Sequence, residues 1–255
     1  MEHPLTIEQL ASAEVSLAVA SSLLYVEPDP AEVAAQVATD QFSDAPFGTE
    51  DPFMAAGLAA MARWCTATRT AVAVELGCDP GTVGEEELLA SSVFIEAVGA
   101  LRREWLRLFA GAGAPEASCL ESFYVEPNSH MFGKCTLAVR SCYRRHGLQV
   151  ENFRREPDDH LGLMLGFLSR LVAEELAARE AGDAATAEAL AAEQEAFLVD
   201  HVLPWLAPWR HAAASHAVSD YFRGAGDLVF GLACAFAERF GIRFDGETRT
   251  FKQRK

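Results

Sequence analysis

The segment 155–167, REPDDHLGLMLGF, places ionisable side chains and a proline directly before an apolar run. Asp158, Asp159 and His160 are residue types that bind metals, exchange protons or cap helices. From these residues alone, the segment is a metal site, an acid/base pair or a capped helix N-terminus. The spacing of the other polar residues helps to distinguish these three interpretations.

The first interpretation, a metal site, lacks further ligands at a suitable spacing. Helical metal sites usually present two ligands three or four residues apart. None of the seven histidines has Asp or Glu three residues before it, and His211 and His216 are five residues apart. We therefore expect no metal site. The segment 224–231, GAGDLVFG, resembles a phosphate loop, but it follows no strand and lacks the P-loop lysine, so we expect its glycines to permit close helix packing.

Acid/base catalysis and helix capping are both compatible with the residue types. Adjacent residues on a helix point about 100° apart, which disfavours a direct bond between Asp159 and His160. Capping requires less: Pro157 begins a turn, Asp158 or Asp159 caps the helix, and His160 lies in its first turn. Exposed carboxylates at a helix N-terminus can also receive a guanidinium, so capping and binding remain open together.

The elements that position this segment are predicted to be helices. Apolar residues recur at three- and four-residue spacing, and alternating strand patterns are almost absent, so the fold class is all-α, bundle-like. Proline- and glycine-containing breaks occur at 27–30, 77–81, 111–115 and 204–208. The predicted helices are 7–25, 30–41, 52–76, 85–109, 132–146, 159–181, 184–202 and 211–240.

A hinge loop is expected before the helix that starts near Asp159. Pro157 disfavours helix at Glu156, so the helix ending near His146 cannot simply continue into Asp159. We predict a single domain, with a larger helical part in 1–150, a hinge in 151–160 and C-terminal helices in 161–255.

The charge distribution indicates a cationic partner. The net charge is −16, which argues against nucleic-acid binding. No Lys or Arg precedes Arg63, whereas ten Asp and Glu do; six Lys and Arg then lie between residues 131 and 155. The N-terminus lacks the basic start of a secretory signal, and no apolar run of about 18 residues occurs. The six cysteines form no CxxC pair, and we expect reduced thiols, with Cys135 and Cys142 in packing roles.

Five segments of the chain form a recognisable series. They are LRREWLRLFAGAGAPEASCLESFY at 101–124, KCTLAVRSCYRRHGL at 134–148, EPDDH at 156–160, QEAFLVDHVLPWLAPW at 194–209 and DYFRGAGDLVFGLACAF at 220–236. EPDDH resembles the E-P-x-D-H hinge motif of the TorD/DmsD family of redox-enzyme maturation chaperones, which bind twin-arginine signal peptides of molybdoenzymes, and the other segments resemble that family's motifs in the same order. The resemblance covers over half of the chain.

The resemblance implies a cytoplasmic, all-helical chaperone without a cofactor and without enzymatic activity. It would bind the twin-arginine leader of a molybdopterin oxidoreductase catalytic subunit and hold that subunit until its cofactor is inserted. The implied oligomeric state is a monomer or a hinge-exchanged homodimer. The implied signal-peptide-binding residues are Glu156, Pro157, Asp158, Asp159, His160, Trp105, Leu108, Phe109, Glu121, Ser122, Tyr124 and Phe167.

Within this set, Glu156, Asp158 and Asp159 are expected to receive the leader's arginines, and Trp105, Leu108, Phe109, Tyr124 and Phe167 to line an apolar groove. Core packing is the alternative for these apolar residues. Asp159→Ala is expected to weaken leader binding by more than it lowers stability. A second hypothesis is an all-α guanine-nucleotide-binding protein or small-ligand enzyme that uses Asp159 and His160.

Overall fold

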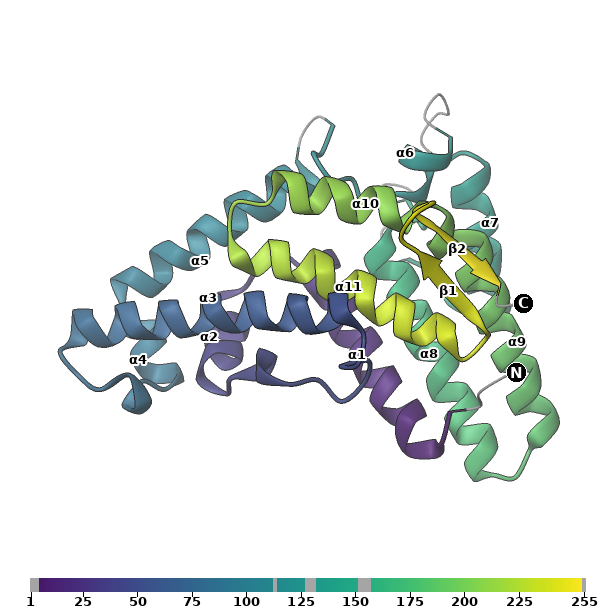
Figure 1. Cartoon of the computed structure of the whole chain (residues 1–255), viewed down its shortest axis with the longest axis horizontal. Helices are drawn as coiled ribbons and strands as arrows, with labels where there is room; N and C mark the ends of the chain where they lie inside the picture. The colour runs from purple at the N-terminus through teal and green to yellow at the C-terminus, as the bar shows by residue number, and fades with distance from the viewer. Residues whose placement is uncertain (1–4, 112–113, 127–131, 151–156, 254–255) are drawn as a thin grey trace.

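The computed structural model describes residues 5–111, 114–126, 132–150 and 157–253. These residues form a helical protein that ends in a two-stranded antiparallel hairpin (Figure 1). The all-α prediction is confirmed. The elements are α1 Ile7–Tyr25, α2 Pro30–Ala38, η1 Gln41–Ser43, α3 Pro52–Leu76, η2 Pro80–Thr82, α4 Glu85–Ala90, α5 Ser92–Trp105, η3 Leu106–Ala110, α6 Glu121–Val125, α7 Lys134–Arg145, α8 Leu161–Glu180, α9 Ala184–Phe197, η4 Leu198–Val202, α10 Leu203–His216, α11 Asp220–Glu238, β1 Ile242–Asp245 and β2 Thr250–Gln253.

Local capping residues set the starts of the first helices. Thr6 and Gln9 form a capping box at the start of α1. The carboxylates of Asp29 and Asp51 accept the first backbone N–H groups of α2 and α3, and each of these helices has proline at its first position, where no N–H bond is lost. The predicted bounds of α1 and α3 are confirmed.

Two helix pairs form the centre of the molecule: α3 packs along α11, and α1 packs along α8. Glycines permit the first contact. A Cβ at Gly224 of α11 would lie 2.6 Å from the carbonyl oxygen of Gly57 in α3, and one at Gly231 would overlap the backbone of Met54. The prediction that the 224–231 glycines serve close packing is confirmed.

α1 is long and apolar enough by composition to span a membrane, and it is the one such helix among the described residues. Leu10, Leu17 and Leu24 of this helix are buried within the shared core. The contact of α1 with α8 accounts for much of this apolar character.

A buried ion pair links the C-terminal helices. The guanidinium of Arg239 donates to both carboxylate oxygens of Glu175, at 2.9 and 3.1 Å, and to the side-chain oxygen of Gln194 at 2.9 Å. All three side chains are buried. Buried charges are stable only when they are paired and hydrogen-bonded, so this network fixes α8 and α9 against the end of α11.

Three predicted elements differ from those observed. The helix predicted for 85–109 is interrupted at Ser91, which caps α5 and binds Glu75. The break predicted at 204–208 lies inside α10, because Pro204 occupies the first turn, where its missing N–H costs nothing. The break falls instead before Asp220, where Ser219 caps α11. The hairpin was not predicted, since its four-residue strands are too short for a clear alternation.

Candidate functional site at the hinge

The described end of the hinge segment, residues 157–160, forms a turn at Asp158 and Asp159 that leads directly into α8. The N–H of Leu161 donates to the carbonyl of Cys119 at 2.7 Å, and that of Glu121 donates to the carbonyl of Asp159 at 3.0 Å. Leu120 and His160 form an antiparallel bridge. α7 ends at Arg145 and α8 begins at Leu161, so the expected interruption between these helices is confirmed. Glu156 lies outside the described residues.

Asp159 points inward and connects the hinge to α6 and α7. Its side chain is fully buried, at 0% exposure. One oxygen accepts the hydroxyl of Thr136 at 2.7 Å, and the other accepts the backbone N–H of Ser122 at 2.9 Å. Ser122 lies in the first turn of α6, where a negative charge is stabilised by the helix dipole. Asp159 therefore accepts a hydrogen bond from the first turn of α6 and does not cap α8.

Asp158 is buried beside Arg140 of α7. Both Nε and Nη2 of Arg140 donate to its Oδ2, at 3.0 and 2.7 Å. In the part of the chain that the structure describes, the buried Oδ1 has no hydrogen-bond partner. The hydroxyl of Tyr143 donates to the backbone carbonyl of Asp158 at 3.0 Å. Burial, and next to it the charge of Asp158, hold the pKa of Tyr143 well above its usual range, so this hydroxyl remains a donor.

His160 caps α8 itself. Its Nδ1 accepts the N–H of Gly162 at 3.1 Å, and its ring meets the ring of Tyr25 edge-on at 5.4 Å. The expectation that Asp158 or Asp159 caps this helix and presents an exposed carboxylate is wrong, because Arg140, Thr136 and Ser122 draw both carboxylates into the interior. An imidazole that accepts through Nδ1 is unprotonated there.

Glu121 forms a second polar contact behind the hinge. Its carboxylate lies 3.2 Å from Nδ1 of His201 in η4, and both side chains are largely buried. Burial alone would lower the pKa of His201, but interactions with Cys142 and Glu121 outweigh it and raise the pKa to about 9. His201 is therefore cationic at neutral pH and pairs with Glu121.

An apolar groove of about 290 Å³ lies between the end of α7 and the first half of α8. Its lining includes Phe167 and Tyr143, and the hydroxyl of Tyr143 bonds to Asp158, so the groove adjoins the hinge. Arg170 at the groove is paired with Glu174 at 2.7 Å. The full lining is Tyr143, Leu148, Gln149, Val150, Leu163, Gly166, Phe167 and Arg170.

Of the side chains expected to line a groove, Phe167 does so, whereas the others lie elsewhere. Leu108 and Phe109 are buried in the core, where Phe109 packs on Trp209 and Phe222. The indole of Trp105 donates to the carbonyl of Leu24 at 3.1 Å. Tyr124 stacks on Trp205 at 5.3 Å. The core-packing alternative applies to Leu108 and Phe109.

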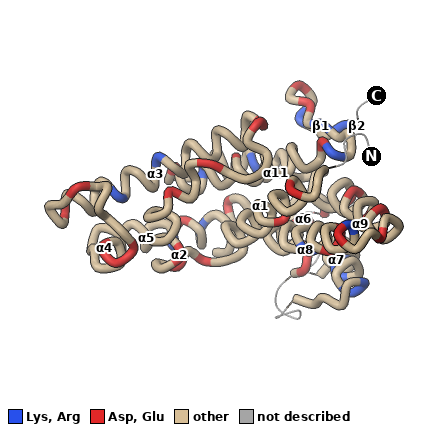
Figure 2. Tube along the Cα trace, turned by 90° about the horizontal axis from the view of Figure 1, so that it is seen from below, with Lys and Arg blue, Asp and Glu red and all other residues tan. Residues whose placement is uncertain are grey.

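Three α7 residues that bind the hinge were not predicted from the sequence: Thr136, Arg140 and Tyr143. Their spacing of four and three places them on one face of a helix. They belong to the basic stretch in which the charge of the chain reverses, which is visible on α7 in Figure 2. Arg140, on the same helix face as Thr136 and Tyr143, is the feature of the sequence that could have indicated a partner for the hinge carboxylates.

The two hinge carboxylates differ in how fully their oxygens are hydrogen-bonded. The two oxygens of Asp159 are bonded to Thr136 and Ser122, so this carboxylate is a structural acceptor. Among the described residues, no group of three His, Cys, Asp or Glu side chains could hold a metal ion. Asp158 has one oxygen on the guanidinium of Arg140 and one without a partner in the described chain, so this carboxylate can accept a further donor.

Comparison with known proteins points to one family. Residues 87–210 match the family described as nitrate reductase delta subunit. The chain is 30% identical over 129 residues to the Tat proofreading chaperone DmsD of Salmonella typhimurium, over 51% of this chain and 56% of the relative. It is 26% identical over 129 residues to the chaperone protein TorD of Vibrio vulnificus, over 51% of this chain and 59% of the relative. The matched region thus spans little more than half the length of these relatives.

Proposed function

Because the chain belongs to the TorD/DmsD family of redox-enzyme maturation chaperones, we propose that it binds the twin-arginine signal peptide of a molybdopterin oxidoreductase subunit. It holds that subunit in the cytoplasm until the cofactor is inserted, and then releases it for export. This function is one of binding, without a catalytic step or a cofactor of its own.

The observation that carries the proposal is the half-satisfied carboxylate of Asp158. Its side chain is 1% exposed, its Oδ2 holds the guanidinium of Arg140, and its Oδ1 has no partner in the described part of the chain. A buried acceptor without a partner costs free energy, which a donor group of a ligand would recover. A leader arginine supplies such a donor, either at Oδ1 or by replacing Arg140.

The other hinge residues support this acceptor. Asp159 joins the hinge to α6 and α7, His160 starts α8, and Pro157 fixes the turn before Asp158. The backbone N–H groups of Glu121 and Ser122 donate to the carbonyl and the carboxylate of Asp159, which attaches the start of α6 to this segment. We assign these residues positioning roles; Trp105, Leu108, Phe109 and Tyr124 support the surrounding core. Glu156 directly precedes this turn, and we propose it as a further acceptor for the arginine pair.

The groove beside the hinge suits the apolar part of a leader peptide. Phe167, Leu163 and Val150 line it, and its volume of about 290 Å³ accommodates a few apolar side chains. A twin-arginine leader is basic at its start and apolar in its middle, and adjoining carboxylate and apolar sites match this order.

Isothermal titration with a twin-arginine leader peptide at low salt tests the proposal. We expect saturable binding that weakens strongly when both arginines are replaced by lysines, because only arginine offers the planar fork of donors. Equal affinity for the two peptides would contradict a guanidinium-specific site.

A further inference from the structure

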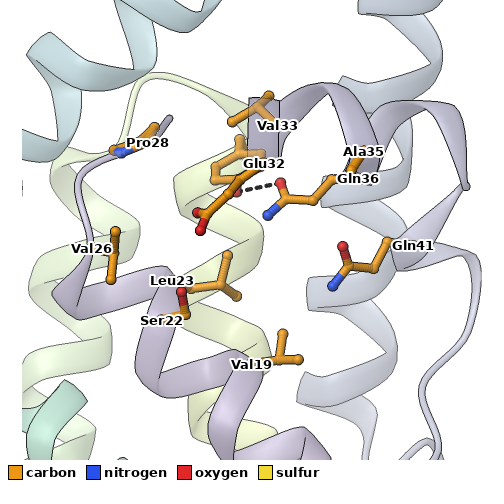
Figure 3. Close-up of a pocket in the computed structure, with 11 residues that line it drawn as sticks. Val19, Ser22, Leu23, Val26, Pro28, Glu32, Val33, Ala35, Gln36 and Gln41 are labelled. Atoms are coloured by element: carbon orange, nitrogen blue, oxygen red, sulfur yellow. Dashed lines mark hydrogen bonds between the residues drawn. The ribbon is translucent and has the colours of Figure 1, made fainter. Parts of the chain in front are cut away.

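A second groove, separate from the hinge motif, runs along the exposed side of α1. One hollow of about 270 Å³ lies between α1 and α2, and another of about 180 Å³ lies between α1 and residues 41–46. Val19 and Gln41 line both hollows, so the two are adjacent. Figure 3 shows the first hollow, with Val19 and Leu23 at its base.

The wall that α1 gives to this groove is apolar and open to solvent. Val15 and Val19 are four residues apart, which places them in one row on the surface of α1, and Val26 follows as the extended residue that caps the C-terminus of this helix. Val15 is 52% exposed and Val26 is 43% exposed. From Val15 to the last helical residue, Tyr25, α1 extends about 15 Å, which is the length of four or five residues of extended chain.

The polar groups of the groove favour a cation. Figure 3 shows the carboxylate of Glu32 and the amide of Gln41 directed into the first hollow, where the side-chain oxygen of Gln36 accepts the hydroxyl of Tyr221 at 2.8 Å. Asp44 lines the second hollow. Among the described residues, no Lys or Arg lines either hollow.

The nearby basic residues do not neutralise this groove. Arg69 pairs with Asp40 at 2.7 Å, and Arg102 pairs with Glu27 at 2.6 Å. Within the described chain, the carboxylate of Glu32 has neither a hydrogen bond nor an ion pair, and it is exposed. Its charge is therefore available to an incoming ligand.

The volumes of the two hollows favour a polypeptide over a small molecule as the ligand. Pockets for drug-sized molecules and cofactors usually enclose about 300–1,000 Å³. Each hollow is smaller than this, and the two follow one another along α1, so each fits one or a few side chains of an elongated ligand. A polypeptide segment presents such side chains in series.

We propose that this groove binds a second polypeptide segment, one that carries a basic side chain for Glu32 and an apolar side chain for the hollow beside Val15. The site is distinct from the acceptor at Asp158 and does not depend on a pair of adjacent arginines. The protein therefore has two binding surfaces for basic, apolar chains, one at the hinge and one along α1.

Fluorescence anisotropy with a labelled 14-residue peptide of leucine, alanine and well-separated single arginines tests this proposal at low salt. We expect Glu32→Lys and Val15→Asp each to weaken binding at least about fivefold. Glu188→Lys on α9 is the matched control, because it reverses an exposed charge outside the groove; it should change the affinity less than about twofold. The same peptide with glutamate for arginine should not bind.

Two results would overturn the second site. Equal weakening by Glu32→Lys and Glu188→Lys would show that only the overall negative charge attracts the probe. Loss of probe binding in Asp158→Asn, with Glu32→Lys unaffected, would place the probe at the hinge. Failure of the hinge to bind a twin-arginine leader is measured separately and leaves this test intact, since the probe contains no arginine pair.

Discussion

Replacement of Asp159 by alanine is expected to destabilise the fold strongly. The substitution removes the acceptor for the Thr136 hydroxyl, which is fully buried, and for the Ser122 N–H, which is partly buried. A buried polar group left without a partner costs about 1–3 kcal/mol and an ordinary lost hydrogen bond about 0.5–1.5 kcal/mol, so the loss amounts to about 1.5–4.5 kcal/mol. For a chain of this size, each kcal/mol lowers Tm by roughly 2–4 °C. The burial of this carboxylate thus reverses the sequence-based expectation that the effect on leader binding exceeds the effect on stability.

Asp159→Asn is the matched control. Its side-chain oxygen can accept the N–H of Ser122, and its NH₂ group can donate to Thr136 once that hydroxyl turns, so both contacts persist. The lost charge at the start of α6 costs about 0.3–1 kcal/mol. Thermal and urea unfolding followed by circular dichroism should show a large loss for the alanine variant and a small one for asparagine. Equal Tm values for the two variants would refute this account of Asp159.

Three further predictions concern stability. Arg239→Met should lower the free energy of unfolding by about 1.5–3 kcal/mol, because it removes the charged hydrogen bonds of Arg239 to the buried Glu175, which keeps Arg179 and Gln194 as partners; urea unfolding measures this, and a change below about 0.5 kcal/mol would contradict it. Gly224→Ala should also lower the free energy of unfolding, because its Cβ would lie 2.6 Å from the Gly57 carbonyl oxygen. Gly182→Ala is the comparison variant. No atom lies within 4 Å of its new Cβ, but φ is positive, so its effect reports backbone strain without packing overlap. The pKa of His201 is raised to about 9, so its protonated form stabilises the fold fully below the unfolded pKa of about 6.5, and this stabilisation is lost as pH rises through 9. The free energy of unfolding should therefore fall between these two pH values, and His201→Gln should remove this fall. An unchanged pH dependence in His201→Gln would contradict the pairing with Glu121.

Local signals account for the parts of the fold that the sequence predicted well. The bounds of α1 and α3 follow from Thr6, Asp51 and Pro52 at their starts, together with long apolar periodicity. The division of α10 from α11 was missed because Pro204 and Pro208 are usual break signals, whereas the first of them lies in a first turn and the second is tolerated inside α10. Whether a proline lies in the first turn or in the interior of a helix depends on the residue at which the helix begins, and tertiary packing helps to determine that residue.

The interruption between α7 and α8 was predicted from the sequence, but the directions of the side chains that precede α8 were not. Asp158 and Asp159 bond to groups that lie 18 to 37 residues away in the chain. No local pattern distinguishes a carboxylate that caps the following helix from one that turns inward to such partners. His160, by contrast, bonds to Gly162 two residues away, yet its role as a cap was missed because histidine is an uncommon residue at that position.

The central claim is that Asp158 receives a leader arginine, and a double-mutant cycle tests it most directly. The affinities of a twin-arginine leader and of its twin-lysine form are measured for the parent chain and for Asp158→Asn. A lysine keeps one charge-assisted hydrogen bond to a carboxylate but lacks the second donor of the planar guanidinium; such a bond is worth about 1.5–3 kcal/mol, so the parent should prefer arginine by roughly 10- to 150-fold. The account predicts that this preference falls to near unity in Asp158→Asn. An undiminished preference in a folded Asp158→Asn variant would contradict it.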